Sequence, residues 1–169
     1  MEIITAKYAG FCFGVKRAVD AVFHLAEEKS EAQIYTVGEL IHNPNVGEKL
    51  KENGIATLSE EHLEEDLKTA GSRSVFVVRT HGIPSSSLEA LHTFVQKNPE
   101  SKILDMTCPF VAKIYRIMEE NTSEDTFTVL IGTATHPEVI GIASYIRGNF
   151  RIFSGFSELS EAFKSDLAQ

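Results

Sequence analysis

The regular alternation of strand-like and helix-like segments is the feature that most restricts how this chain can fold. Runs rich in β-branched residues, such as residues 74–79 and 126–131, are each followed by a turn and then by apolar residues at helical spacing. Repeated strand–helix order with short connections is typical of parallel sheets with right-handed crossovers. The sequence therefore predicts an α/β protein in which helices flank parallel sheets.

The same pattern predicts the individual elements. The expected strands are residues 3–8, 33–37, 55–58, 74–79, 102–105, 126–131 and 150–153. The expected helices begin near residue 14 and otherwise cover residues 46–50, 59–67, 84–96, a segment after residue 109, 137–146 and 158–167. Residues 126–131 have the composition of a central, buried strand, and Ser59 is expected to cap the acidic helix that follows it.

A chain of 169 residues can form one large or two small domains. The sequence Asn-Pro-Glu-Ser at residues 98–101 interrupts the alternation, which favours a boundary near residues 97–102. We expect residues 1–100 to form a first α/β lobe and residues 101–169 a second one. The second half offers only three plausible strands, which is few for an independent sheet, so this lobe is predicted to be incomplete.

Composition excludes several classes of function. The formal net charge of −8 argues against generic binding to nucleic acid or to an anionic membrane. No apolar run approaches the length of a membrane-spanning helix, and the first residues lack the basic and apolar regions of a secretion signal. We therefore expect a cytoplasmic protein. Its two cysteines are far apart and form no disulfide framework, so they indicate metal binding, redox chemistry or simple core packing.

Potential ligands recur where an expected strand gives way to a helix. Four of the five prolines mark such a place, and each follows a histidine or a cysteine: His42-Asn-Pro44, His81-Gly-Ile-Pro84, Cys108-Pro109 and His136-Pro137. Proline is well suited to the first turn of a helix, where its missing N–H is not needed. Cys12 occupies the equivalent position within a glycine-flanked turn, without a proline. The remaining histidines, at positions 24, 62 and 92, fall within expected helices and do not share the pattern.

These positions predict a ligand site, because ligands bind at the carboxyl edge of parallel sheets and helix N-termini there favour anions. Three imidazoles suit a phosphate or diphosphate, since they donate hydrogen bonds and change charge near neutral pH. Glu138 lies in the first turn after His136, where it can serve as a proton donor or simply complement the helix dipole. The alternative is that the histidines are ordinary loop residues and the cysteines are inert core residues.

A metal site is harder to derive from the residues alone. Structural zinc sites contain closely spaced pairs of ligands, and none occurs here. Cys12 and Cys108 on separate strand ends better suit a cluster held centrally, but iron–sulfur clusters commonly take four thiolates. Two other interpretations therefore stay open: a non-enzymatic α/β module that binds diphosphate or another anion, and a zinc or dithiol protein.

Five segments together resemble one enzyme family. They are Gly10-Phe-Cys-Phe-Gly-Val-Lys-Arg-Ala18, Ile41-His-Asn-Pro44, Thr80-His-Gly-Ile-Pro84, Asp105-Met-Thr-Cys-Pro109 and His136-Pro-Glu-Val139. In order and approximate spacing they resemble 4-hydroxy-3-methylbut-2-enyl diphosphate reductase, the last enzyme of the non-mevalonate isoprenoid pathway. Each segment alone is a weak signal, whereas the five in sequence are highly specific.

The resemblance implies a three-lobed, trefoil-like α/β architecture around a 4Fe–4S cluster held by three cysteines. It implies that Cys12 and Cys108 are cluster ligands, that His42, His81 and His136 bind the allylic diphosphate substrate, and that Glu138 delivers protons. The implied reaction removes the substrate hydroxyl as water and yields isopentenyl and dimethylallyl diphosphates. Ferredoxin or flavodoxin is the implied electron donor.

Two departures from the family pattern stand out. The third cluster cysteine and a Ser-x-Asn segment belong to a third lobe that is absent here, and the first strand of this chain would be expected to pack with that lobe. Thr133 also stands where many family members have histidine. We therefore interpret the chain as the first two lobes of a reductase, which alone is expected to bind a cluster weakly or not at all and to be inactive.

Overall fold

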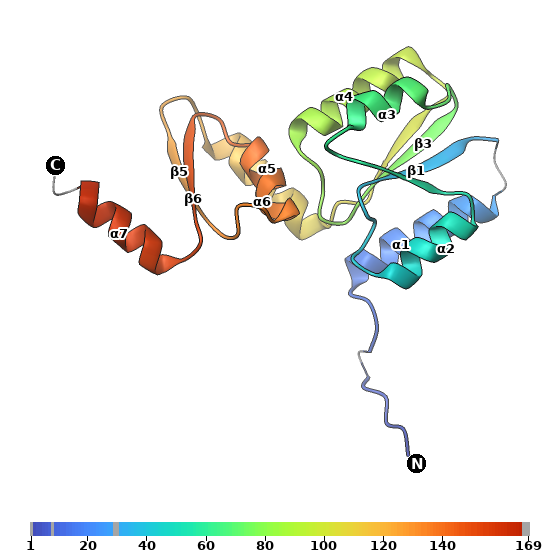
Figure 1. The fold of residues 1–169 in the computed structure, drawn as a ribbon, viewed down its shortest axis with the longest axis horizontal. Helices are drawn as coiled ribbons and strands as arrows, with labels where there is room; N and C mark the ends of the chain where they lie inside the picture. The colour runs from blue at the N-terminus through green and yellow to red at the C-terminus, as the bar shows by residue number, and fades with distance from the viewer. Residues whose placement is uncertain (1, 8, 29–30, 167–169) are drawn as a thin grey trace.

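The computed structural model describes residues 2–7, 9–28 and 31–166, and within them strands and helices alternate along the chain (Figure 1). The strands are β1 (Gln33–Val37), β2 (Ala56–Leu58), β3 (Ser74–Val78), β4 (Lys102–Asp105), β5 (Phe127–Ile131) and β6 (Asn149–Phe153). The helices are α1 (Phe13–Glu27), α2 (Pro44–Glu52), α3 (Leu63–Thr69), α4 (Ser85–Lys97), α5 (Pro109–Asn121), α6 (Pro137–Ser144) and α7 (Phe156–Asp166).

The larger sheet has the strand order β2-β1-β3-β4, and every pair in it is parallel. Helices α1 and α2 cover one face of this sheet, and α3 and α4 cover the other (Figure 1). All five residues of β3 are buried, which requires that helices cover both faces of the sheet. Val75 and Val77 pack toward α1 and α2, whereas Phe76 and Val78 pack toward α3 and α4. The predicted α/β class is confirmed.

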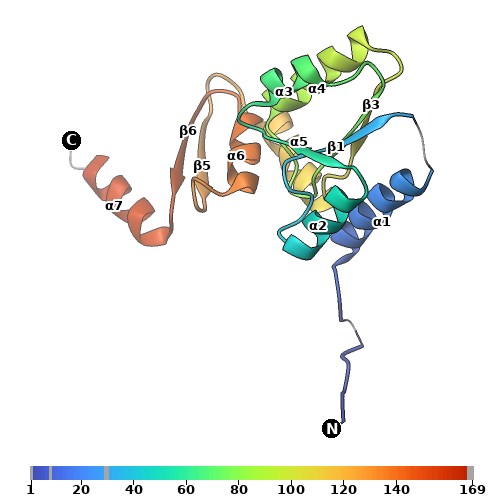
Figure 2. The ribbon, with the colours of Figure 1, turned by 45° about the vertical axis from the view of Figure 1, so that its right-hand side comes forward.

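The smaller sheet consists of the parallel strands β5 and β6, and α5 and α6 lie between it and the larger sheet (Figure 2). The expectation that residues 126–131 form a central, buried strand is wrong. Phe127 and Ile131 are 63% and 60% exposed. The alternating exposure of β5 has a simple cause: within the described residues it has one neighbouring strand, and helices cover only one of its faces.

The expected boundary near residue 100 is also misplaced. β4 pairs with β3, so the larger sheet extends to Asp105 and the change of sheet comes after that residue. The interruption at residues 98–101 is the turn from α4 into β4, where the Ser101 N–H donates to the Asn98 carbonyl. The break in the pattern at residues 98–101 is therefore the connection from a helix to the next strand within one βαβ unit, and not a boundary between two lobes.

Two further expectations need correction. Residues 2–7 are exposed and form no strand, and they extend away from both sheets (Figure 1). Tyr8, the last residue of that expected strand, lies outside the described ranges. The helix expected from residue 59 begins at Leu63, because the Ser59 N–H turns back to donate to the Asp66 carboxylate.

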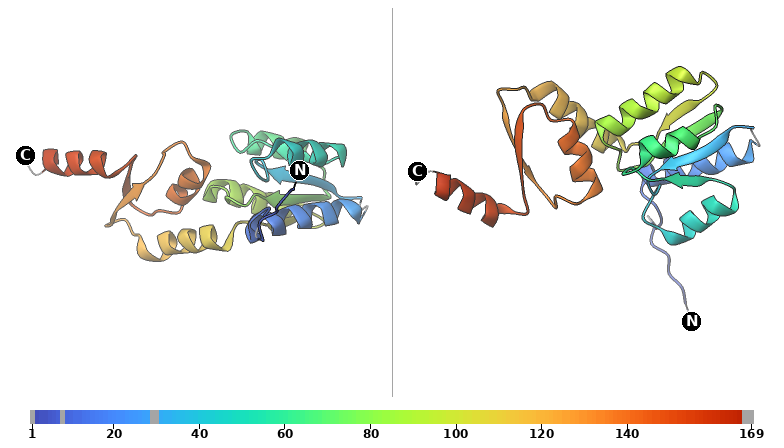
Figure 3. Two further views of the ribbon diagram at one scale, coloured as in Figure 1. Left: turned by 90° about the horizontal axis from the view of Figure 1, so that it is seen from below. Right: turned by 45° about the horizontal axis from the view of Figure 1, so that its top comes forward.

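The two sheets lie side by side, with β5, β6 and α7 on the far side of α6 from the larger sheet (Figure 3). No helix in the described part of the chain is both long enough and apolar enough to cross a membrane. The junction is made by α4, α5 and α6, where Ser85 donates from its backbone N–H to the Ser144 hydroxyl at 2.9 Å and from its own hydroxyl to the Ser144 carbonyl at 2.8 Å. The carboxyl ends of β1, β3, β4 and β5 lead into the segments that carry the predicted ligands.

Candidate functional site

Helix N-termini position the predicted ligands. Cys12, Cys108 and His136 are the residues that directly precede the first turns of α1, α5 and α6. His42 and His81 lie in the turns that lead from β1 into α2 and from β3 into α4. Each side chain is therefore placed where unpaired backbone N–H groups and the positive end of a helix dipole favour an anion.

The three histidines from different strand ends come together. The rings of His42 and His81 stack with 5.2 Å between their centroids. The ring of His136 meets that of His81 edge to face, at 6.2 Å and an interplanar angle of 82°. His81 is thus the central member of a cluster that joins the edge of the larger sheet to α6, and we call His42, His81 and His136 the histidine cluster.

The pKa of His81 is lowered, chiefly because burial penalises its charged form and also because His42 and the Arg79 guanidinium lie nearby. The charge of Glu138 opposes this shift in pKa. The Nδ1 atom of His81 is buried and has no hydrogen-bond partner, which is uncommon for a polar atom inside a protein. His81 is therefore neutral at neutral pH, and a neighbouring negative charge would favour its protonation.

The other two rings are oriented by local hydrogen bonds. The backbone N–H of Glu138 donates to Nδ1 of His136 at 3.2 Å, so Nδ1 is the acceptor and the ring hydrogen of the neutral form is on Nε2. His42 Nδ1 lies 3.3 Å from a carboxylate oxygen of Glu39. His136 can therefore present an Nε2 donor, next to the half-buried side chain of Glu138.

The turns that carry these residues are connected by backbone contacts. The Cys108 N–H donates to the Thr80 carbonyl at 2.8 Å, which places the Cys108 turn beside that of His81. The Thr80 hydroxyl donates to the carbonyl of Leu40 at 3.5 Å, toward the turn of His42. His42, His81 and Cys108 therefore belong to one connected edge of the larger sheet, and His136 meets this edge from the start of α6.

The two cysteines are free thiols at neighbouring helix starts. Cys12 is exposed and Cys108 is half-buried. A Cβ added at Gly14, in the first turn of α1, would lie 3.4 Å from Sγ of Cys108, so that turn packs against the second thiol. The Arg17 guanidinium secures this contact by donating to the carbonyls of Met106 and Thr107 at 3.2 and 2.9 Å.

Cysteine sulfur atoms are the ligands that iron–sulfur clusters use. In this respect Cys12 and Cys108 fit such a cluster. Within the described residues no group of three or more histidine, cysteine or acidic side chains is arranged to hold a metal ion.

Two residues that sequence reasoning missed surround His81. Arg79 is 6% exposed, donates from Nε to the Gly82 carbonyl at 3.1 Å and forms an ion pair with Glu60 at 2.5 Å. Tyr115 of α5 donates from its hydroxyl to the His81 carbonyl at 3.0 Å. Of these two residues, only Arg79 could have been noticed in the sequence. It is a charged residue that directly follows five strand residues and precedes His81 by two positions.

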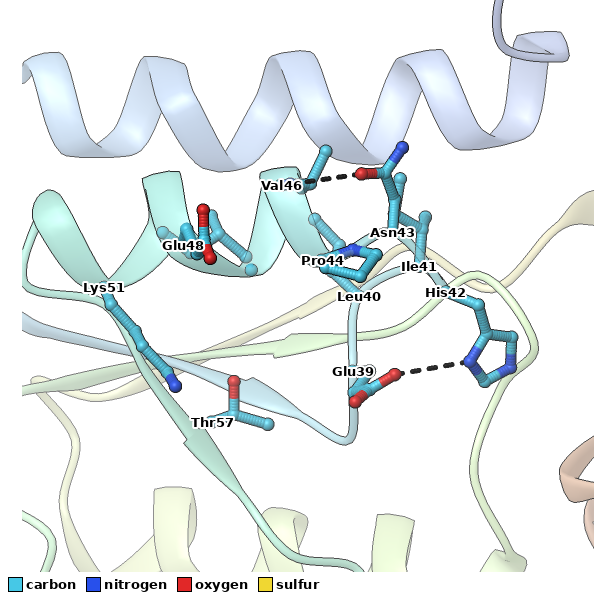
Figure 4. Close-up of a pocket in the computed structure, with 12 residues that line it drawn as sticks. Glu39, Leu40, Ile41, His42, Asn43, Pro44, Val46, Glu48, Lys51 and Thr57 are labelled. Atoms are coloured by element: carbon cyan, nitrogen blue, oxygen red, sulfur yellow. Dashed lines mark hydrogen bonds and ion pairs between the residues drawn. The ribbon is translucent and has the colours of Figure 1, made fainter.

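A separate cavity of about 620 Å³ opens beside His42, between α2 and the ends of β1 and β2 (Figure 4). Glu39 and His42 lie at one end of it, and Lys51 points toward Thr57 at the other. Its lining includes the apolar residues Leu40, Ile41, Val46 and Leu50. The cavity shares only His42 with the histidine cluster, so we do not regard it as the anion site.

Comparison with known proteins gives the same family along nearly the whole chain. Residues 3–167 match the family described as LytB protein. The 4-hydroxy-3-methylbut-2-enyl diphosphate reductase of Caldanaerobacter subterraneus subsp. tengcongensis is 40% identical over 158 residues, which cover 94% of this chain and 52% of that relative. The reductase of the same name from Aquifex aeolicus is 37% identical over 172 residues, which cover 98% and 54%.

A solved structure agrees with this result. The structure of (E)-4-hydroxy-3-methyl-but-2-enyl diphosphate reductase, described as the terminal enzyme of the non-mevalonate pathway, aligns with a TM-score of 0.69 and 34% identity. The alignment covers 96% of this chain and 54% of the solved one. The chain thus spans about half the length of the relatives that it matches.

Proposed function

The chain belongs to the LytB protein family, and on this basis we propose that it is the N-terminal part of a 4-hydroxy-3-methylbut-2-enyl diphosphate reductase. The longer protein would remove the hydroxyl group of this substrate with two electrons and protons, giving isopentenyl and dimethylallyl diphosphates and water. It would have three α/β lobes, of which this chain supplies the first and an incomplete second. Alone, the chain is expected to have no reductase activity.

The observation that carries the proposal is the histidine cluster. Three strand ends that are far apart in sequence bring His42, His81 and His136 into ring contact. Each ring stands at or just before the start of a helix, and the central one has a buried, unpaired Nδ1. Such a group of donors suits the diphosphate of the substrate, because charge-assisted hydrogen bonds to phosphate oxygens are strong and helix N-termini add to them.

Cys12 and Cys108 would hold a 4Fe–4S cluster together with a cysteine from the remainder of the protein. When bound, such a cluster would supply Lewis-acid and electron-transfer chemistry at the hydroxyl end of the substrate. The residues of this chain would fix the diphosphate at the histidine cluster and so orient the other end of the substrate. Ferredoxin or flavodoxin would provide the electrons, and the cytoplasm is the proposed location.

Glu138 is the proposed proton donor. Its charge raises the pKa of His81, against the effect of burial. It sits in the first turn of α6, and its backbone N–H fixes the ring of His136. A carboxyl group at this position can pass a proton to the leaving hydroxyl while the histidines hold the diphosphate.

The test of this function uses a polypeptide of the relatives' full length, assayed anaerobically with the allylic diphosphate and a reduced electron donor. We expect turnover by the wild-type protein and a loss of about 100-fold or more in kcat for Glu138→Gln, because general acid catalysis contributes at least this much. Glu120→Gln is the matched control, since Glu120 is exposed near the opposite end of α5 from Cys108. An inactive wild-type protein that contains its cluster, or an unaffected Glu138→Gln variant, would contradict the assignment.

A non-enzymatic anion-binding module is the second candidate, because the histidine cluster needs no metal to bind phosphate. Calorimetric titration of the 169-residue chain with pyrophosphate measures this capacity. We expect His81→Ala to weaken binding about 10-fold or more, the factor for one lost charge-assisted hydrogen bond, with exposed His92→Ala as control. Tight binding without metal, together with no turnover by the full-length protein, would favour the module over the enzyme.

A further inference from the structure

We propose that Tyr115 is a positioning residue that fixes His81 relative to His136 and Glu138, by joining the two sheets at one point. This inference rests on the proposed function, since it concerns the geometry of the same site. His81 follows β3 of the larger sheet, whereas His136 and Glu138 follow β5 of the smaller one. Their mutual placement therefore depends on how the two sheets are joined.

Tyr115 is in direct contact with the His81 turn. Its hydroxyl donates to the His81 carbonyl at 3.0 Å, and its ring packs against Gly82 so closely that a Cβ there would overlap it. Gly82 also has a φ of +72°, which glycine adopts without strain. The turn therefore holds its shape around the tyrosine side chain.

The same hydroxyl touches α6. A Cβ on Gly141, one turn after Glu138, would also overlap the Tyr115 hydroxyl oxygen. Gly141 is thus the point at which α6 approaches Tyr115, and Gly82 is the point at which the His81 turn approaches it. These contacts explain why glycine is needed at two positions close to the predicted ligands: Gly82 beside His81, and Gly141 in α6.

The side chain of Tyr115 is itself held in place. It is 7% exposed and stacks on Tyr145 with 4.3 Å between ring centroids. Burial raises the pKa of Tyr115, so its hydroxyl keeps its proton and stays a donor. Ser85 and Ser144 also join α4 to α6, through hydrogen bonds to each other. Tyr115 is the link that reaches His81.

The test is nuclear magnetic resonance of the 169-residue chain, with nuclear Overhauser effects measured between histidine ring protons. The His81–His136 signal reports the placement that Tyr115 would fix, and the His42–His81 signal is an internal reference within the larger sheet. We expect the ratio of the first signal to the second to fall in Tyr115→Phe, because the hydroxyl that holds the His81 turn beside α6 is lost. Gly141→Ala should lower it as well, by pushing the hydroxyl away.

Tyr145→Phe is the matched control, because it removes a hydroxyl from the same stacked pair without touching the His81 carbonyl. An unchanged ratio in both Tyr115→Phe and Gly141→Ala would overturn the proposal, as would an equal fall in the Tyr145→Phe control. Pyrophosphate affinity of Tyr115→Phe should also fall, by at most the factor of about five that one lost hydrogen bond represents. If the wild-type chain bound no pyrophosphate, the proposed diphosphate site would be contradicted, whereas the role of Tyr115 would still be decided by the signal ratio.

Discussion

Replacing Arg79 with alanine is expected to lower the free energy of unfolding by about 3–5 kcal/mol, the usual cost of removing one partner of a buried ion pair. The side chains of Arg79 and Glu60 are only 8% and 19% exposed, and their charged atoms lie 2.5 Å apart. Arg79→Ala would leave the Glu60 carboxylate buried without its counter-ion. It would also remove the hydrogen bond from Arg79 Nε to the Gly82 carbonyl, which closes the turn of His81.

The loss of unfolding free energy in Arg79→Ala should depend on pH in a definite direction. Burial raises the pKa of Glu60 even with Arg79 beside it, and removing the guanidinium takes away the main opposing effect on that pKa. A carboxyl group whose pKa is higher in the folded state than in the unfolded state binds more protons when folded, so its folded state is favoured as the pH falls. The destabilisation of Arg79→Ala should therefore be smaller at pH 5 than at pH 8.

Urea unfolding followed by far-ultraviolet circular dichroism measures both effects. Arg73→Ala is the matched control, because Arg73 forms exposed ion pairs with Glu31 and Glu100 and should cost much less stability. A double variant, Arg79→Met with Glu60→Leu, should recover part of what Arg79→Met alone loses, since no unpaired charge remains. Equal losses for Arg79→Ala and Arg73→Ala would contradict this description of the pair.

Local pattern was sufficient to predict the elements of the larger sheet. β1 and β4 begin and end where expected, because each is a short apolar run bounded by turns, and α5 begins at Pro109 as its sequence indicates. The strand–turn–helix order also predicted that His42, His81 and His136 would come to one edge, since parallel strands direct their carboxyl ends the same way. His42 and His81 do follow strands of the larger sheet, whereas His136 follows β5 of the smaller sheet and meets them across the junction. The structure places the three rings in contact.

Features that depend on partners could not be predicted in the same way. The composition of residues 126–131 suits a buried strand, yet burial of β5 requires neighbours that the described residues do not supply. The segment at residues 2–7 has strand composition but no strand beside it. The roles of Tyr115 and of Glu60 depend on contacts between elements that are distant in sequence, such as the hydrogen bond from Tyr115 to the His81 turn. The spacing of residue types along a short stretch of sequence does not predict such contacts.

We propose that Cys12 and Cys108 form one site with the histidine cluster, as ligands of an iron–sulfur cluster. The structure brings the thiols to adjacent helix starts, where Gly14 packs against Cys108 Sγ. The backbone bond from the Cys108 N–H to Thr80 connects that thiol to the turn of His81. Thiolate ligands bind iron directly and serine replaces them poorly, so either Cys→Ser change should have a very large effect.

The most direct measurement is the iron and sulfide content of the full-length polypeptide after anaerobic reconstitution, together with its reductase turnover. We predict about four irons per wild-type chain, and in Cys12→Ser and Cys108→Ser a loss of most of the iron and a fall in turnover of more than about 100-fold. Ser123→Ala, an exposed position just beyond the opposite end of α5, should match the wild type. Full iron content and full turnover in either cysteine variant would contradict the assignment of these residues as cluster ligands.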